Sequence, residues 1–504
     1  MSAQRSSRFE NGEQVVVMKF GGTSVEDAVA VRRLIEIVQS RGSSRPVVVV
    51  SALAGVTDQL LQAGRDAANR RLGSALAAVH DIYVRHESIA DEFVYGESYR
   101  ELNGELRSEF RALETLLLEL DQSRALIPQC KDQLLGFGES LSSVLVNAAL
   151  RAAGVLAEHV DARACILTDT RYGQATPLWD ATNLRIQECV GPLLDSGCVP
   201  VMGGFIAATA NGIPTTLGRG GSDFTAAIVG AALFASRMEI WTDVAGVMTA
   251  DPRLCPEAVV IPRMSFDEAA ELAHCGAKVL HPATLAPAAR ENIPVHVLNS
   301  RDPEGSGTEI VAAARRNDSV SAIAAKRHVA SVEIESERGL DSEVLRSVSD
   351  VFAQHSCPVE LLALSQGRLS LLASSSEDLT VIAANLRGIA KMRWEDHKAL
   401  VSLVGENIRR QPEIASRAFA SVADMEVRVV CHGASDRTIS FLVEESAVAR
   451  AVQRLHRIFF PQLDSSQPEV SQSDWGGISS AFCQAGTRQP TGPNEDSAAQ
   501  LGRL

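Results

Sequence analysis

The chain begins with a strand, a glycine-rich turn and a helix, and this order restricts its fold more than any other feature. Val15–Phe20 is a continuous apolar run interrupted only by Lys19, and the tetrapeptide GGTS follows at once. Apolar residues then recur at helical spacing over residues 26–39, and Pro46–Ser51 is a second buried strand. A β-loop-α-β opening of this kind predicts a parallel sheet covered by helices.

The same alternation continues through the first 310 residues. We expect helices over 58–126, Leu134–Leu150 and Ser222–Phe234, and strands over Val155–Asp161, Ala164–Leu167, Cys198–Phe205, Met238–Asp243 and Ile293–Leu298. A glycine-rich turn over Thr215–Gly221 precedes the last of these helices, with Ser222 or Asp223 as its predicted N-cap.

From about residue 320 the pattern changes to two similar units. The first reads as strand Val329–Ile334, helix Leu340–His355, strands Val359–Leu364 and Leu369–Ala373, and helix Leu379–Ile389. The second reads as strand Ala399–Val404, helix Asn407–Ala423, strands Glu426–Cys431 and Thr438–Val443, and helix Ser446–Phe459. An offset of roughly 70 residues between them indicates an internal duplication.

Both ends of the chain have a different composition from the rest. Residues 1–14 contain no apolar segment of a signal peptide, and we expect them to be flexible. Residues 464–504 are rich in Ser, Gln, Gly, Pro, Asp and Glu, so we expect a tail that cannot bury enough apolar surface to fold.

Charge and cysteine content narrow the classes of function. A net charge of −14 excludes a protein that holds nucleic acid or an anionic membrane through its overall field, so an anionic substrate would need a locally cationic pocket. No apolar run approaches the roughly 18 residues of a membrane span. Nine cysteines without a C-x-x-C pair argue against a zinc knuckle and favour a reducing, cytoplasmic location.

Two glycine-rich segments carry cations at predicted strand-to-helix junctions. Lys19 stands before Gly21 and Gly22, and Arg219 lies within the run from Leu217 to Asp223. Backbone amides at such junctions bind anions, and Arg can grip a carboxylate or a phosphate with two hydrogen bonds. Either segment alone could be an ordinary turn, and neither is a P-loop. Their occurrence together in one sheet favours an anion-binding site.

Three further segments are candidates with weaker signals. Glu139 lies in an otherwise apolar helix, where it could hold a substrate ammonium or be a solvated residue near a helix N-terminus. Trp241-Thr242-Asp243 ends a strand and leads into a turn-rich loop, a common ligand site in α/β folds. His274, Cys275 and His281 match no zinc spacing, which favours a structural role and no metal site.

The chain resembles the aspartate kinases (aspartokinases) of the amino-acid kinase superfamily. The resemblance rests on KFGGTS at 19–24, SALAGVTDQL at 51–60, GFGES at 136–140, TTLGRGGSDFTAA at 215–227, EIWTDVAGVMTADPR at 239–253 and GAKVLHPAT at 276–284. The duplicated region is similar to the paired ACT domains of these enzymes, and the arrangement most resembles the monofunctional, lysine-sensitive type. No dinucleotide-binding G-x-G-x-x-G unit follows, which argues against a fused homoserine dehydrogenase.

The resemblance implies a fold class and a division into domains. The fold would be α/β, an amino-acid kinase-type three-layer sandwich with a mainly parallel sheet, followed by two α+β ferredoxin-like ACT domains. The catalytic domain would span 15–315 and the ACT-like domains 316–398 and 399–463, with interlacing of these two left open. Pairing of ACT domains between subunits would give a homodimer or homotetramer.

The implied reaction is the transfer of the γ-phosphate of MgATP to the β-carboxylate of L-aspartate, giving 4-phospho-L-aspartate. This is the first step towards lysine, threonine, methionine and diaminopimelate, and feedback through the ACT domains is expected, with lysine as the first candidate effector. ATP would be a co-substrate, and no prosthetic group or protein-bound metal is expected. Lys19 and Asp223 would be the principal catalytic groups.

The resemblance also assigns contacts residue by residue. Nucleotide contacts would come from Lys19, Phe20, Gly21, Gly22, Thr242, Asp243, Met248, Arg253, Lys278 and Val279. Aspartate would lie among Thr57, Glu139, Arg219, Gly220, Gly221 and Ser222. An effector would contact Ser336, Gly339, Leu340, Glu360, Ser365 and Gln366. Met248 replaces a Tyr that many members carry, and Gln366 lacks the charge of a Glu in lysine-sensitive relatives, so both contacts depart from the family pattern.

Two other functions compete with this interpretation. One is another amino-acid kinase, acting on glutamate or acetylglutamate, against which the ACT-like repeats and the loop from Arg219 to Asp223 count. The other is a catalytically silent amino-acid sensor, against which the intact charges of Lys19, Arg219 and Asp223 count.

Overall fold

A computed structural model describes residues 14–42, 44–277, 282–314, 320–336, 339–355, 357–365, 367–374, 379–433 and 435–461. Residues 15–314, within the predicted catalytic domain and called the catalytic region below, are built on one eight-stranded sheet in the order β3-β5-β2-β1-β8-β10-β11-β9. Its strands are β1 (Val15–Phe20), β2 (Arg45–Val50), β3 (Ala157–Val160), β5 (Val199–Gly203), β8 (Arg237–Thr242), β9 (Arg263–Ser265), β10 (Val295–Asn299) and β11 (Thr308–Val311). Every neighbouring pair from β3 to β10 is parallel, and β10 with β11 is antiparallel. The prediction of a mainly parallel sheet is confirmed.

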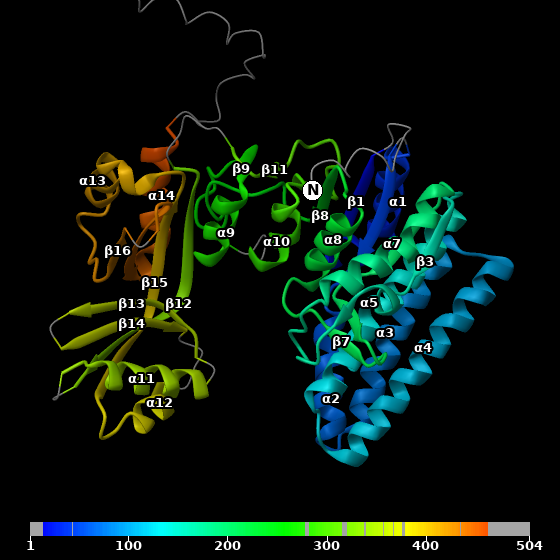
Figure 1. Cartoon of the computed structure of the whole chain (residues 1–504), viewed down its shortest axis with the longest axis horizontal. Coiled ribbons are helices and arrows are strands. Elements are labelled where there is room, and N and C mark those ends of the chain that lie inside the picture. The colour runs from blue at the N-terminus through cyan, green and yellow to red at the C-terminus, as the bar shows by residue number, and fades with distance from the viewer. Residues whose placement is uncertain are drawn as a thin grey trace, which may run out of the picture. The chain divides into compact units, whose positions relative to one another are not determined.

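Helices cover both faces of this sheet (Figure 1). One layer contains α1 (Ala28–Ser40), α2 (Val56–Ala68), α3 (Leu72–Phe93), α4 (Gly96–Ser123) and α5 (Pro128–Ala152), and the other contains α6 (Ala162–Cys165), α7 (Trp179–Asp195), α8 (Gly221–Ala232), α9 (Phe266–His274) and α10 (Pro282–Arg290). Alternate residues of a strand point to opposite faces. Accordingly, Met18 packs against the first layer and Val17 against the second, and the region is a three-layer sandwich.

Two local predictions are wrong. The predicted strand over Ala164–Leu167 is wrong at its start, because Ala162–Cys165 forms a short helix whose N-cap Asp161 accepts from the Arg163 amide; only Leu167 of the predicted strand lies in a strand. Helix α8 begins at Gly221 with Gly220 as its N-cap, so neither Ser222 nor Asp223 caps it. A small second sheet of β4 (Leu167–Thr168), β6 (Ile206–Thr209) and β7 (Pro214–Thr216) was not predicted, since strands this short carry no readable period.

Residues 320–461, within the two predicted ACT-like domains and called the regulatory region below after that prediction, are built on a six-stranded sheet in the order β13-β14-β12-β15-β17-β16. The strands are β12 (Ala322–Glu335), β13 (Val359–Ser365), β14 (Arg368–Ser374), β15 (Lys391–Val404), β16 (Val430–His432) and β17 (Thr438–Glu444), and the helices are α11 (Ser342–Gln354), α12 (Leu379–Asn385), α13 (Pro412–Ser421) and α14 (Val448–Phe459). The predicted helix over 407–423 is divided, because Pro412 starts α13 after a separate 3₁₀ turn at Ile408–Arg410.

Strands β12 and β15 each run through both halves of this region (Figure 1). Residues 322–326 of β12 pair with 400–404 of β15, whereas residues 329–335 pair with β14 and with the first half of β15. The unit with α11 and α12 is therefore inserted into the unit with α13 and α14. The predicted boundary between residues 398 and 399 falls inside β15.

Candidate active site

The candidate active site lies where the strand order of the large sheet reverses. Strand β1 has β2 on one side and β8 on the other, and ligands of open parallel sheets bind at such a point, beyond the carboxyl ends of the strands. The loops after β1 and β2 touch there, since the Ala54 amide donates to the Gly22 carbonyl at 3.1 Å. A Cβ on Gly22 would come within 2.9 Å of the Ala52 carbonyl oxygen, so only glycine allows this contact.

These loops open onto a cavity of about 410 Å³. The cavity brings together nine predicted site residues from four segments of the chain: Lys19, Gly22, Thr57, Glu139, Arg219, Gly220, Gly221, Ser222 and Asp223. Sequence reasoning missed eight further lining residues: Ser51, Ala52, Leu53, Ala54, Gly55, Asp58, Phe205 and Gly218. Six of these eight belong to the segment at 51–60 that carries the family resemblance, which was the available signal.

An ion pair joins the two predicted catalytic residues. Lys19 Nζ lies 2.8 Å from Asp223 Oδ1, and each side chain is only 12% exposed. That oxygen has no hydrogen bond of good geometry among the described residues. The contact is thus a charge pair that leaves the ammonium able to reorient towards a ligand, while low exposure limits screening by water.

The glycine loop before α8 presents a free cation beside unpaired amides. Gly218 and Gly220 have φ of 78° and 71°, the left-handed region that favours glycine. Between them Arg219 is exposed, and among the described residues no ion-pair partner is recorded for it. Gly220 provides no side-chain cap. The Gly221 amide donates to the Gly218 carbonyl at 2.9 Å, and the next two amides of α8, those of Ser222 and Asp223, remain available for an anion.

Glu139 lies in the middle of α5 and not near a helix N-terminus, which removes the solvated alternative. Its side chain is buried, and its Oε2 atom has no hydrogen-bond partner in the described part of the chain. Burial raises the pKa of Glu139 to about 8, and the Ala52 amide and the charge of Lys19 oppose this shift only in part. A buried carboxyl that lines a cavity with one oxygen unpaired is suited to a cationic group of a ligand.

Asp132 supports the same wall of the cavity and was missed by sequence reasoning. It is buried on α5, where its Oδ2 accepts from the amides of Gly173 and Thr216, both at 2.8 Å, and its Oδ1 accepts from the Thr216 hydroxyl at 3.0 Å. Thr216 directly precedes the glycine loop. Asp132 and Glu139 are seven residues apart, two helical turns, so that spacing could have placed both on one helix face.

The predicted nucleotide residues do not line this cavity, apart from Lys19 and Gly22. The Phe20 side chain is fully buried and stacks on Trp241 with ring centroids 6.2 Å apart, so only its backbone can face a ligand. Gly21 donates its amide to the Trp241 carbonyl at 3.0 Å. Lys278 and Val279 lie outside the described residues.

The remaining nucleotide candidates follow β8 in an open loop. Thr242 is half-buried, Asp243 is exposed and Met248 is half-buried. Arg253 is bound to its neighbour Asp251 at 2.6 Å, and its side chain is 76% exposed. The structure therefore leaves this half of the site open.

The predicted effector residues lie in the inserted unit. The Gly339 amide donates to the Ser336 carbonyl at 3.1 Å, Leu340 is half-buried and Ser365 is exposed. Glu360 forms an ion pair with Lys326. Gln366 is not among the described residues.

Two searches of the described residues found nothing. No group of three or more His, Cys, Asp or Glu there is arranged to hold a metal ion. None of the helices in the described part of the chain is both long and apolar enough to cross a membrane.

Comparisons with known proteins agree with this geometry. The family model described as Amino acid kinase family matches residues 14–299, and an ACT domain model matches residues 401–459. Lysine-sensitive aspartokinase 3 of Escherichia coli (strain K12) is 35% identical over 458 residues, which is 89% of this chain and 99% of that protein. Aspartokinase 1, chloroplastic, of Arabidopsis thaliana is 32% identical over 484 residues, which is 90% of this chain and 81% of that protein.

Solved structures of an aspartokinase are also similar to this chain. The crystal structure of E. coli aspartokinase III in complex with aspartate and ADP (R-state) matches with a TM-score of 0.77 at 34% identity, covering 89% of this chain and 100% of that one. The structure of the same enzyme with lysine and aspartate (T-state) matches with a TM-score of 0.77 at 33% identity, covering 88% and 99%.

Proposed function

Since the chain belongs to the aspartokinases of the amino acid kinase family, we propose that its cavity joins L-aspartate to the γ-phosphate of ATP. The protein is an aspartate kinase, a phosphotransferase with a carboxyl group as acceptor. The observation that carries the assignment is one cavity that holds the Lys19–Asp223 pair, the unpaired Arg219 and the buried Glu139. These groups complement two anions and one ammonium.

The chemistry needs charge neutralisation more than proton transfer. A β-carboxylate with a pKa near 3.9 is already ionised at pH 7. One of its oxygens forms a bond to the γ-phosphorus, the bond from that phosphorus to the β,γ-bridging oxygen breaks, and ADP leaves with the electron pair. No proton is transferred, so the enzyme must mainly hold two anions in line and offset their charge.

Each residue of the cavity has a role that follows from its chemistry. Arg219 takes the α-carboxylate of aspartate, and Glu139 takes the ammonium. Lys19 moves from Asp223 onto the phosphates, while Asp223 orients it in the free enzyme. Thr57, Gly220, Gly221 and Ser222 complete the aspartate side with a hydroxyl, backbone amides and a further hydroxyl.

The nucleotide enters as MgATP, with Mg²⁺ as part of the substrate. Gly21 and Gly22 supply backbone close to the phosphates, and Thr242, Asp243, Met248 and Arg253 line the approach after β8. Phe20 contributes its backbone, and Lys278 and Val279 remain predicted contacts. Arg253 is paired with Asp251 before the nucleotide arrives, so its contact requires that pair to open.

Trapping of the product tests this function. The purified protein is incubated with MgATP and L-aspartate in hydroxylamine, which converts an acyl phosphate into a hydroxamate. Hydroxamate that depends on both substrates supports the proposal, and its formation from glutamate or acetylglutamate in place of aspartate would contradict it. ADP release without hydroxamate would also contradict it.

Lysine is the effector that we propose for the regulatory region. The E. coli relative is named lysine-sensitive, and one structure of it contains lysine. In this chain Glu360 is already paired with Lys326, so an effector ammonium must compete with an internal one. Lysine should therefore inhibit more strongly in a K326A variant than in the original protein, with threonine and methionine as comparison ligands. Equal inhibition of both proteins would contradict the role of Glu360.

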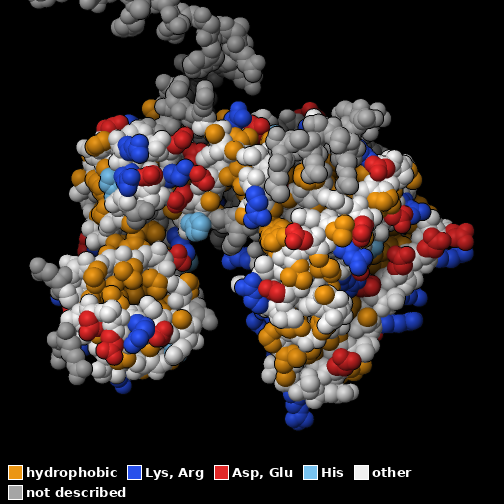
Figure 2. All heavy atoms as spheres, viewed as in Figure 1, with side chains coloured by type: hydrophobic (Ala, Val, Ile, Leu, Met, Phe, Trp, Pro, Cys, Tyr) orange, Lys and Arg blue, Asp and Glu red, His pale blue; other side chains and the backbone are white. Residues whose placement is uncertain are grey.

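We also propose a homodimer joined through strand β13. This edge strand exposes Val359, Leu362 and Leu364 by 41%, 57% and 56%, and Figure 2 shows hydrophobic side chains gathered over β13 and β14. An exposed apolar edge strand is a template for pairing with another chain. A monomer in analytical ultracentrifugation would contradict the proposal, and L362K with L364K should convert a dimer to monomers.

A cytoplasmic location remains the prediction from the cysteine content. The described cysteines are all free. This agrees with a reducing compartment.

A further inference from the structure

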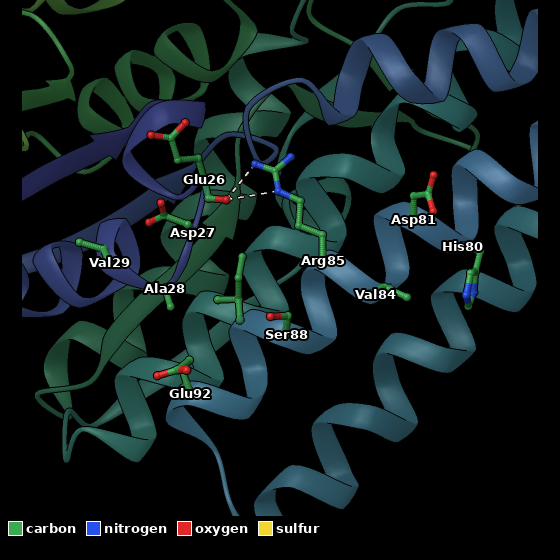
Figure 3. A pocket seen from close by; sticks show the side chains of 11 residues that line it. Glu26, Asp27, Ala28, Val29, His80, Asp81, Val84, Arg85, Ser88 and Glu92 are labelled. Atoms are coloured by element: carbon green, nitrogen blue, oxygen red, sulfur yellow. Dashed lines mark hydrogen bonds between the residues drawn. The ribbon is translucent and has the colours of Figure 1, made fainter.

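The loops that form the catalytic cavity are also contacted from their outer side. A hollow of about 620 Å³ lies there between α1 and α3, lined by residues 26–29 and by side chains of α3 that include Val84, Arg85 and Ser88 (Figure 3). Of these, Arg85 is the side chain that reaches the catalytic loops.

Arg85 donates all of its recorded hydrogen bonds to backbone carbonyls of those loops. Its Nη1 donates to the Ala54 carbonyl at 2.7 Å. Its Nη2 and Nε donate to the Glu26 carbonyl at 2.8 and 3.3 Å (Figure 3). The guanidinium thus forms a planar fork between two segments that are far apart in the sequence.

Both acceptors belong to loops that form the catalytic cavity. Glu26 ends the loop that begins with Gly21 and Gly22, and its carboxylate is held by Arg301 at 3.3 Å. Ala54 lines the aspartate cavity, and its amide bonds to the Gly22 carbonyl. A single cation therefore fixes the nucleotide-side loop against the aspartate-side loop, directly behind the point where they touch.

We propose that Arg85 is a positioning residue for phosphoryl transfer, which holds the loop after β1 and the loop after β2 at the separation that brings the two substrates into line. The inference rests on the proposed function, because it concerns the alignment of aspartate with the γ-phosphate. Arg85 touches neither substrate. It acts through Glu26 and Ala54, and its role differs from that of Lys19 and Arg219, which contact the anions themselves.

The surroundings of Arg85 indicate that its removal should affect the alignment of the substrates more than the stability of the fold. The side chain is half-buried and borders an open hollow, so its removal admits water and leaves no closed apolar cavity. The two carbonyls can then bond to water, and global stability should change little. Alignment is more demanding, since a displacement of about 1 Å can lower a rate about 10²-fold.

Steady-state kinetics of R85A and R85Q test the proposal. We expect kcat to fall at least about tenfold in R85A while both KM values stay within about threefold, because the groups that bind the substrates remain. Gln keeps one donor, so R85Q should lie between R85A and the original protein. R32A is the matched control: Arg32 links α1 to Glu92 of α3 at 3.8 Å and does not contact the catalytic loops. Its kcat should be unchanged.

Chemical rescue provides a second measurement, and a purely structural role of Arg85 would give no rescue of kcat. Methylguanidinium can enter the open hollow, so it should raise the kcat of R85A several-fold and leave the original protein and R32A unaffected. An unchanged kcat in folded R85A, or a loss confined to the thermal midpoint, would overturn the proposal. If R85A does not fold, R85Q is used for both measurements, and an unchanged kcat there has the same meaning. Failure of the proposed function is a different result, since the original protein would then form no hydroxamate.

Discussion

The aspartate side of the active site and the loop after β8 differ in how far their side chains are fixed before a ligand arrives. On the aspartate side, Glu139 is buried in the middle of a helix, and Asp132 fixes Thr216, just before the glycine loop, through two hydrogen bonds and the segment at Gly173 through a third. In the loop after β8, Asp243 is exposed and Arg253 is bound to its neighbour Asp251. The proposed acceptor site is thus preorganised, whereas we expect the proposed nucleotide site to be completed only when the nucleotide binds.

The two sides also differ in what they pack against. The aspartate side rests on helices of the catalytic region. The loop after β8 contributes Ala250 and Cys255 to the core of the regulatory region, together with Leu403 and Phe441. Thr249 bonds through its hydroxyl to His456 of α14 at 2.9 Å, and its carbonyl accepts from the Ile323 amide at 2.7 Å. A conformational change in the regulatory region should therefore alter nucleotide binding more than aspartate binding.

The largest effect should come from Lys19, which serves both sides. In K19A we expect kcat to fall at least about 10²-fold, the scale of losing one charge partner of the transition state. Coupled measurement of ADP release, with circular dichroism to verify folding, checks this. A nearly normal rate in the folded variant would show that Lys19 is not the charge partner of the transferred phosphate.

Glu139 should make the aspartate side sensitive to pH. With a pKa of about 8, its carboxyl is mostly protonated in the free enzyme at pH 7, and only the ionised form binds an ammonium. The KM for aspartate should thus fall about 25-fold as the pH rises from about 6.5 to 8.5, while the KM for ATP changes little. In E139Q the KM for aspartate should be raised and its pH profile flat. A pH profile in E139Q that matches the original one would assign the titration to another group.

Asp132 tests whether the aspartate side depends on a fixed scaffold. D132A leaves three buried donors without an acceptor, so we expect a loss of about 3 kcal/mol in the free energy of unfolding and a KM for aspartate raised about fivefold. D132N is the control, because its oxygen can accept from both amides and its NH₂ group can donate to Thr216. If D132N behaves like D132A, the charge of Asp132 matters and not its shape.

The smallest effect concerns the contact with the regulatory region. In H456A we expect the KM for ATP to rise about threefold with no change in the KM for aspartate, since a single hydrogen bond to the loop after β8 is lost. R454A is the control, as Arg454 lies on the same helix and pairs with Asp424 inside the regulatory region. A rise in the KM for aspartate alone would contradict the prediction, because it would link the regulatory region to the aspartate side and not to the loop after β8.

The sequence was most informative where side-chain type alone determines the local structure. The apolar run around Lys19 predicts a buried strand, and the glycines near Arg219 predict a tight loop, so both anion sites could be located. The spacing of Asp132 and Glu139 could have placed both on one helix face, but the role of Asp132 could not be predicted, because one acidic residue in a helix resembles a solvated one until its hydrogen-bond donors are seen. Arg85 was equally hidden, since its partners are backbone carbonyls and carry no sequence signal.

The regulatory region shows a second kind of failure. Apolar periodicity identified 329–334 and 399–404 as strands, yet each is only half of a 14-residue strand. The missing half of β15 is more polar and largely exposed, and there a period cannot separate strand from loop. The missing half of β12 is apolar at first but ends in the consecutive polar residues Lys326, Arg327 and His328, which interrupt the period. Which half pairs with which partner depends on contacts between distant residues, and a local pattern contains no information about them.

The interlaced strands impose an order on how the regulatory region forms during synthesis. Residues 322–326 emerge from the ribosome first, but their partners at 400–404 follow only after the whole inserted unit has been made. At about 5–20 residues per second, this delay lasts roughly 4–14 seconds. The inserted unit, whose pairs all lie within 329–398, can fold during that interval, and its completed β15 then brings the two separated halves of the outer unit together. Nascent chains halted before residue 400 should therefore contain a folded inserted unit and an apolar segment of β12, residues 322–326, that has not yet paired with β15.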